Sequence, residues 1–117
     1  MKSKKTKQLL QATNKWLVRL DEVKKTKEEP SFDLVRQKTY EMDEWLDEWK
    51  DEMLEWITAE KPAVQQEQIL NAYEASKKLV VQSFYPSTRR ALFRMSIQSL
   101  QYTLKRIITV QEGGSCE

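Results

Sequence analysis

Residues 35–57 read VRQKTYEMDEWLDEWKDEMLEWI, and this stretch decides the fold. Its apolar residues recur at intervals of three, four or seven positions: Val35, Met42, Leu46, Trp49, Met53 and Trp56. Because an α-helix has 3.6 residues per turn, these side chains share one face, with Ile57 at its margin. The intervening residues are mostly charged, and neither glycine nor proline interrupts the run. The pattern predicts a long amphipathic helix whose apolar stripe must be covered by other helices.

Three prolines, Pro30, Pro62 and Pro86, divide the rest of the chain. Proline is tolerated in the first turn of a helix but not in its interior, so each proline indicates a boundary. Ser31 and Ser87 are the predicted N-caps. We expect four helices, at about residues 4–27, 32–57, 62–84 and 88–111.

The other three segments also carry helical stripes. Their apolar and small residues are Leu9, Thr13, Trp16, Leu17, Leu20 and Val23 in the first, Ile69, Ala72, Tyr73, Ser76, Val80, Ser83 and Phe84 in the third, and Phe93, Ile97, Leu100, Leu104 and Ile107 in the fourth. Both glycines lie near the C-terminal end, which argues against a β-fold rich in turns. Short connections make consecutive helices antiparallel. The sequence predicts an all-α, up-down-up-down four-helix bundle that forms a single domain over residues 1–112, with a flexible tail at 113–117.

Several kinds of active site are excluded by missing residue types. The chain has no histidine, which removes Ser–His and Cys–His pairs and the Glu-x-x-His motif of di-iron bundles. No glycine precedes Gly113, so there is no glycine-rich phosphate loop. Cys116 has no CxxC partner. We expect no enzymatic activity and no cofactor.

The same residues indicate the compartment. One cysteine cannot form an internal disulfide, which is typical of a reducing environment. No apolar run is long enough for the core of a signal peptide or for a membrane span. A cytoplasmic protein without membrane contact is therefore expected.

Charge is distributed unevenly, although the formal net charge is only +2. Residues 1–28 carry nine basic and three acidic side chains, whereas residues 29–60 carry three basic and eleven acidic ones. We expect the basic first helix to lie beside the acidic second helix. The near balance of charge and the lack of a known reader motif argue against nucleic-acid binding.

One candidate partner surface lies on the second helix. Asp43, Asp47 and Asp51 share a face opposite the apolar stripe, and Trp45 lies at the edge of that stripe. The acidic face is interpreted as a solvated face, as a surface for a basic partner or a mimic of nucleic-acid phosphate, or as a metal site. Trp45 is expected to be half exposed, with an indole N–H free for a partner.

A second candidate surface lies on the fourth helix. Met95 and Tyr102 are seven residues apart and project away from the core stripe, with Leu92 and Ser99 nearby. Scattered apolar residues are common on protein surfaces. If these four form one patch, it predicts a homodimer or the docking of a protein partner.

Residues 61–104 carry a further pattern, in this order and spacing: Lys61-Pro62, Glu67-Gln68-Ile69, Val81-Gln82-Ser83-Phe84, Arg89-Arg90…Phe93 and Ser99…Tyr102-Thr103-Leu104. The pattern resembles the YppE-like family of small bacterial proteins of unknown function. The first two segments match this family mainly in length and pattern. The resemblance implies an antiparallel four-helix bundle in the cytoplasm of a low-GC Gram-positive bacterium, and it implies no catalytic or ligand-binding residues.

The leading functional hypothesis is a non-enzymatic protein–protein interaction or adaptor module with an unknown protein partner. The alternative is a bundle that binds a small molecule or metal in a cavity between its helices. The expected cavity lining is aromatic: Trp16, Trp49, Trp56, Tyr73 and Phe84.

Overall fold

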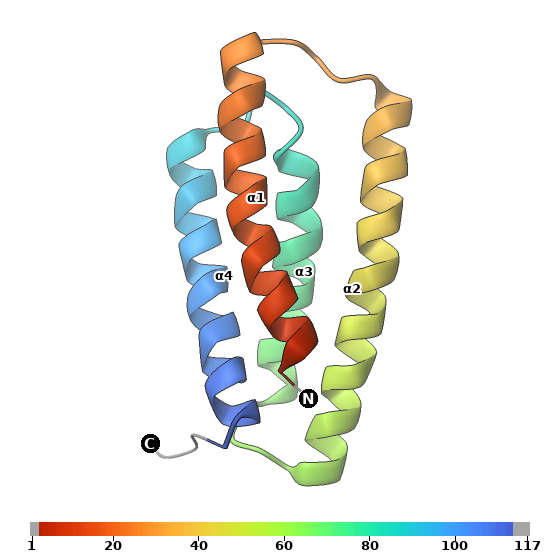
Figure 1. Ribbon diagram of the computed structural model, residues 1–117, viewed down its shortest axis with the longest axis vertical. Coiled ribbons are helices and arrows are strands. Elements are labelled where there is room, and N and C mark those ends of the chain that lie inside the picture. Colours follow the sequence, from red (N-terminus) through yellow and green to blue (C-terminus); the bar gives the residue numbers. More distant parts are fainter. Residues whose placement is uncertain (1–2, 114–117) are drawn as a thin grey trace.

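The computed structural model describes residues 3–113, which contain four α-helices and no strand. The helices are α1 (Lys4–Thr26), α2 (Phe32–Glu60), α3 (Gln66–Gln82) and α4 (Arg90–Gln111). They run alternately up and down in an elongated bundle of 46 × 26 × 22 Å (Figure 1). The predicted all-α four-helix bundle is confirmed. Cys116 and the predicted tail, apart from Gly113, lie outside the described residues.

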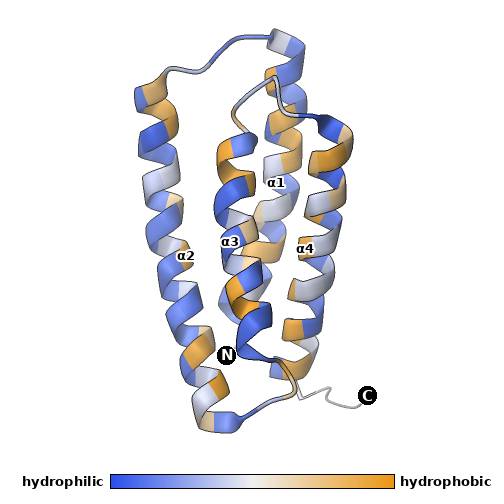
Figure 2. Ribbon diagram, turned by 180° about the vertical axis from the view of Figure 1, so that it is seen from behind, coloured by the Kyte–Doolittle hydropathy of each residue, from blue (hydrophilic) through white to orange (hydrophobic). Residues whose placement is uncertain are grey.

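The predicted stripes form the core of this bundle. Every stripe residue predicted in α3 and α4 is buried, and Leu17, Val23 and Met42 are half-buried at the edge of the core. Apolar residues recur between hydrophilic ones along each helix (Figure 2). Isolated helices of this polarity are marginally stable in water, so burial of the stripes holds the fold together.

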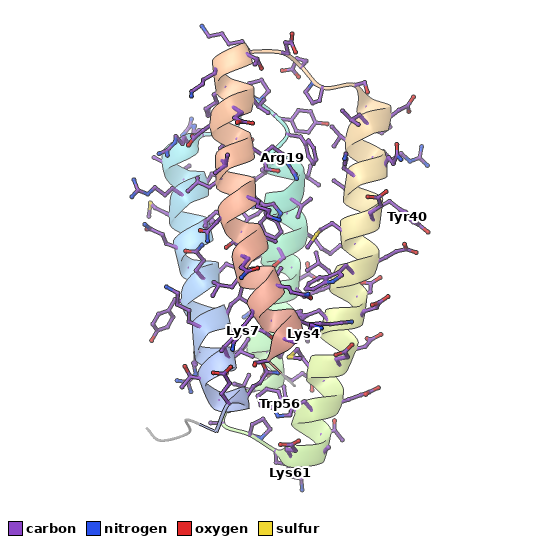
Figure 3. All side chains as sticks on the ribbon, in the orientation of Figure 1. Lys4, Lys7, Arg19, Tyr40, Trp56 and Lys61 are labelled. Atoms are coloured by element: carbon purple, nitrogen blue, oxygen red, sulfur yellow. The ribbon has the colours of Figure 1, made fainter. Side chains whose placement is uncertain are left out.

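The second helix begins where predicted but ends later. The Leu34 backbone N–H donates a hydrogen bond of 3.1 Å to Ser31 Oγ, so Ser31 is the N-cap. The helix continues to Glu60, beyond the predicted end at residue 57. Lys61 then adopts a left-handed backbone, with φ of 49°, and lies at the end of α2 (Figure 3).

The third helix begins at Gln66, so the prediction that Pro62 opens it is wrong. Residues 62–65 form a non-helical connection in which Val64, only 1% exposed, inserts into the core. The backbone N–H of Gln65 donates to Gln68 Oε1 at 2.8 Å, which satisfies one unpaired group at the helix start. Because Val64 is buried in the core, the chain stays non-helical up to Gln65 and the helix begins at Gln66.

The connection between α3 and α4 is longer than predicted, because α3 ends at Gln82 and α4 begins at Arg90. Ser87 is not the N-cap, and that prediction is wrong. The Thr88 hydroxyl donates to the Gln82 carbonyl at 2.8 Å, and the Thr88 N–H donates to the Tyr85 carbonyl at 3.1 Å. These bonds fold the connection into a turn. The bond to Gln82 provides a donor for a backbone carbonyl at the end of α3, before α4 starts.

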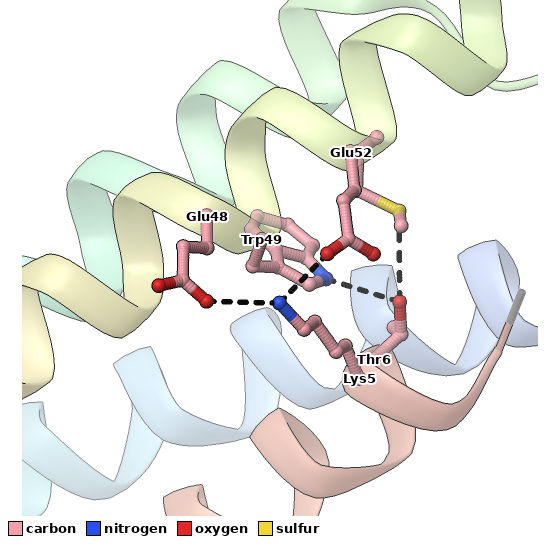
Figure 4. Close-up of polar contacts among 6 residues, drawn as sticks. Lys5, Thr6, Glu48, Trp49 and Glu52 are labelled. Atoms are coloured by element: carbon pink, nitrogen blue, oxygen red, sulfur yellow. Dashed lines mark hydrogen bonds and ion pairs between the residues drawn. The ribbon is translucent and has the colours of Figure 1, made fainter.

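The helices do not pack equally closely around the bundle. α1 packs against α4, α4 against α3, and α3 against α2, whereas α1 approaches α3 diagonally. α1 and α2 do not pack closely against each other, and the space between them is widest near their connection and narrows towards the N-terminal end of α1 (Figure 1). The fully buried Trp49 of α2 spans this space, and its indole N–H donates to Thr6 Oγ1 of α1 at 3.0 Å (Figure 4). Because the separation of packed helices depends on the side chains between them, the large indoles keep α1 and α2 apart.

Candidate functional site

One edge of the acidic run on α2 is engaged with α3. The Tyr73 hydroxyl donates a hydrogen bond to Asp47 Oδ1, and Lys77 Nζ donates to the Tyr73 oxygen at 3.4 Å. The ammonium groups of Lys50 and Lys77 lie 4.6 and 5.1 Å from the centre of the Tyr73 ring. The hydrogen bond with Asp47 raises the pKa of Tyr73, and the hydrogen bond with Tyr73 raises the pKa of Lys77, to which Asp43 also contributes. Asp47 therefore joins two helices, although its side chain is exposed.

The opposite edge of the acidic run faces α1. Lys5 Nζ lies 3.1 Å from Glu48 Oε1 and 2.7 Å from Glu52 Oε2 (Figure 4). The hydrogen bond with Glu52 is the main reason why the pKa of Lys5 is raised. The expected contact between basic α1 and acidic α2 is made here through long side chains. Ion pairs this exposed contribute little stability individually.

Asp51 is the exposed member of the predicted acidic row that has no hydrogen-bond or ion-pair partner among the described residues. Since Asp43 is half-buried and Asp47 is engaged with Tyr73, the row is less available to a basic partner than the sequence indicated. Within residues 3–113, no three Cys, Asp or Glu side chains gather closely enough to hold a metal ion.

Trp45 is half-buried and lies across a groove from Trp16. The groove opens between α1 and α2, with Val80 of α3 in its lining. Of the five aromatic residues expected to line an internal cavity, Trp16 lines this groove, whereas Trp49, Trp56, Tyr73 and Phe84 do not. The separation of α1 from α2 thus creates a surface feature that differs from the predicted cavity.

Met95 and Tyr102 lie on the outer face of α4, where they are 64% and 74% exposed. Met95 borders a groove of about 610 Å³ between α3 and α4, together with Leu92, which is 54% exposed. The buried Leu79 and Phe93 contribute to the lining of this groove. Tyr102 lies farther along α4, beyond the lining residues. The structure therefore brings Met95 and Leu92 together at one apolar groove, on the face where α3 and α4 stand side by side (Figure 2).

The charged residues that line the α3–α4 groove are basic. Lys78 and Arg89 line it, whereas Arg94 is exposed on α4 outside the lining. None of these three has a carboxylate within ion-pair distance among the described residues. By contrast, Arg90 Nε lies 2.5 Å from Asp21 Oδ1 of α1 and lowers the pKa of that carboxyl. α4 contains no acidic residue from Arg90 to Gln111, so every charged side chain on this helix is positive.

The polar residues near the α3–α4 turn serve the fold. Ser83 Oγ donates to the Val80 carbonyl at 2.7 Å and accepts a hydrogen bond from Arg19 at 3.0 Å. Lys24 Nζ donates to the Pro86 carbonyl at 2.9 Å. Arg19 was missed as a candidate site residue, because the pattern of α1 alone does not show what its side chain contacts.

The α3–α4 groove was also missed from the sequence, although Leu92 and Met95 on the α4 side of its rim were identified. The absence of acidic residues from α4 was the available signal, since it distinguishes this helix from the other three. In the part of the chain that the structure describes, no helix has the length and apolarity needed to cross a membrane.

Comparison with known proteins supports the fold and leaves the chemistry open. Residues 6–110 match a bacterial domain of unknown function, DUF1798. The crystal structure of YppE from Bacillus subtilis is similar to this chain, with a TM-score of 0.82 and 25% sequence identity over 93% of this chain and 90% of that one. No curated protein matches. The YppE-like resemblance is therefore confirmed.

Proposed function

The chain belongs to the DUF1798 family of bacterial domains of unknown function, and from its surface we propose that it is a non-enzymatic interaction module. Its α3–α4 groove binds an amphipathic helix whose apolar stripe is flanked by acidic residues. One observation carries this proposal: exposed Leu92 and Met95 border an apolar groove whose basic residues have no carboxylate partner among the described residues.

The apolar rim of the groove and its continuation along α4 support a helical occupant. Leu92 and Met95 lie one turn apart on α4, and Tyr102 lies two further turns along the same face. This strip is about 15 Å long, which matches roughly three turns of a partner helix. Helices that bind in grooves use anchors at such spacings, and methionine adapts its shape to varied partners.

The charges determine the kind of helix. Lys78 and Arg89, which line the groove, would attract Asp and Glu side chains beside the partner's apolar stripe. A basic helix with the same stripe would be repelled, so the charges provide discrimination as well as attraction. Because these cations are exposed, binding should weaken as salt is added.

The test uses two designed peptides of roughly four helical turns. They share a leucine stripe, and all remaining positions are glutamate in one peptide and lysine in the other. Fluorescence anisotropy measures the binding of each peptide to the purified chain. We expect the acidic peptide to bind and the basic peptide to bind at least about tenfold more weakly. Equal binding of both peptides, or binding of neither, would overturn the proposal.

Variants locate the interaction on the protein. Met95→Glu should weaken binding of the acidic peptide at least about tenfold, because it places a carboxylate on the groove's rim. Tyr40→Glu is the matched control, since Tyr40 is 63% exposed and points away from the bundle on α2 (Figure 3). The proposal fails if the two variants lose affinity equally. It also fails if light scattering shows a dimer that Met95→Glu dissociates, because a second copy would then occupy the groove.

A further inference from the structure

A second groove, separate from the α3–α4 groove, lies between α1 and α2. Trp16, Met42, Trp45 and Val80 form its apolar lining, and its volume is about 320 Å³. Trp16 and Val80 are each 2% exposed, whereas Trp45 and Met42 are half-buried at its mouth. This volume lies at the small end of the range for ligand pockets, which is about 300–1,000 Å³. Trp45, the more accessible of the two indoles, favours a flat apolar ring as the occupant.

Arg19 of α1 also lines this groove. Its side chain extends from α1 towards α3 (Figure 3), where one guanidinium N–H donates to Ser83 Oγ at 3.0 Å. The guanidinium also lies over the Phe84 ring, 4.2 Å from its centre. Burial lowers the pKa of Arg19, because the surroundings disfavour the charged form.

No carboxylate compensates this charge. Arg19 forms no ion pair with a described residue, and its hydrogen bond to Ser83 uses only one of five guanidinium N–H donors. Glu41 also lines the groove but is not within 4 Å of the guanidinium nitrogens. Lys38 adds a second positive side chain to the lining. A half-buried, unpaired guanidinium beside an apolar groove is suited to an anion that brings its own apolar group.

We propose that the α1–α2 groove binds a small molecule with a planar apolar ring and one carboxylate. The ring lies against Trp45 and Met42, the apolar residues accessible at the mouth, and the carboxylate accepts hydrogen bonds from Arg19. Glu41 disfavours ligands with a second negative group, because two carboxylates at this mouth would repel each other. This proposal stands independently of the α3–α4 groove, since the two grooves share no lining residue.

Two probes of the same shape test the proposal: 2-naphthoate and its neutral amide, 2-naphthamide. NMR titration of the tryptophan indole N–H signals measures binding, because neither Trp16 nor Trp45 has a hydrogen-bond partner for this group among the described residues. We expect 2-naphthoate to shift both signals and to bind about tenfold or more tightly than the amide. Equal affinities, or shifts confined to other tryptophans, would overturn the proposal.

Two variants separate a binding role for Arg19 from a structural one. Arg19→Gln should remove the preference for 2-naphthoate over the amide. Glu41→Gln leaves Arg19 and its contacts intact, so it should raise the affinity for 2-naphthoate about threefold and leave that for the amide unchanged. Lys78→Gln, in the other groove, is the matched control and should change neither affinity. The proposal is refuted if Glu41→Gln does not strengthen 2-naphthoate binding or if the preference survives Arg19→Gln.

Discussion

Replacing Thr6 with valine tests the buried polar contact that joins α1 to α2. Thr6 Oγ1 accepts a hydrogen bond from the Trp49 indole N–H at 3.0 Å and donates to Met53 Sδ at 3.6 Å. Thr6 and Trp49 are both 0% exposed. Valine has nearly the shape of threonine but no hydroxyl, so Thr6→Val preserves packing and leaves a buried N–H without an acceptor.

The magnitude follows from that unpaired donor. A buried hydrogen-bonding group left without a partner costs about 1–3 kcal/mol. The contact with sulfur adds little, because a thioether is a weak acceptor. Burying a methyl group in place of the hydroxyl returns roughly 0.8 kcal/mol. We expect the free energy of unfolding to fall by about 1–2 kcal/mol and the Tm to fall by about 4–8 °C.

Urea unfolding, followed by circular dichroism and tryptophan fluorescence, measures this loss. Thr58→Val is the matched control, because the Thr58 hydroxyl donates to the Leu54 carbonyl at 3.0 Å from an exposed position on α2. The control should remain within about 0.5 kcal/mol of wild type. If Thr6→Val is as stable as that control, the indole N–H does not depend on Thr6 and the reasoning is wrong.

Three further predictions concern stability, each measured by urea unfolding against wild type. Leu46→Ala, at a core position that is 0% exposed, should cost about 2–5 kcal/mol, and a loss under 1 kcal/mol would contradict the tight packing around it. Ser31→Ala removes the N-cap of α2 and should cost about 1 kcal/mol, whereas Ser31→Asp should retain most of the stability. The pair with Arg90 lowers the pKa of Asp21 below its ordinary 3.8, so it stabilises the fold above that pH and is lost as pH falls through the lowered value. The advantage of wild type over Arg90→Gln should therefore be present at pH 7 and absent near pH 2; an advantage that is the same at both would exclude this origin.

The candidate sites show the limit of reading single helices. A helical wheel correctly groups Asp43, Asp47 and Asp51 on one side of α2, but it does not reveal which helix this side approaches. Tyr73 and Lys77 engage Asp47 only because α3 packs against that edge. A contact between residues on different helices depends on how far each helix is rotated about its axis, which no pattern within one helix specifies.

The sequence by itself determined the four helices, the side of each that is buried and the alternating direction of the chain. These properties are local, because residues three or four positions apart share a face and short connections leave little choice of direction. Proline and serine also located the start of α2, with Ser31 as its cap.

Only the tertiary structure decided which helices pack closely and where the grooves lie. The separation of α1 from α2 depends on the volumes of indoles such as Trp49, and the start of α3 depends on burial of Val64. Both effects arise between residues far apart in the chain, where packing outweighs local helical preference. The unpaired charge of Arg19 beside Trp16 and Trp45 follows from that packing.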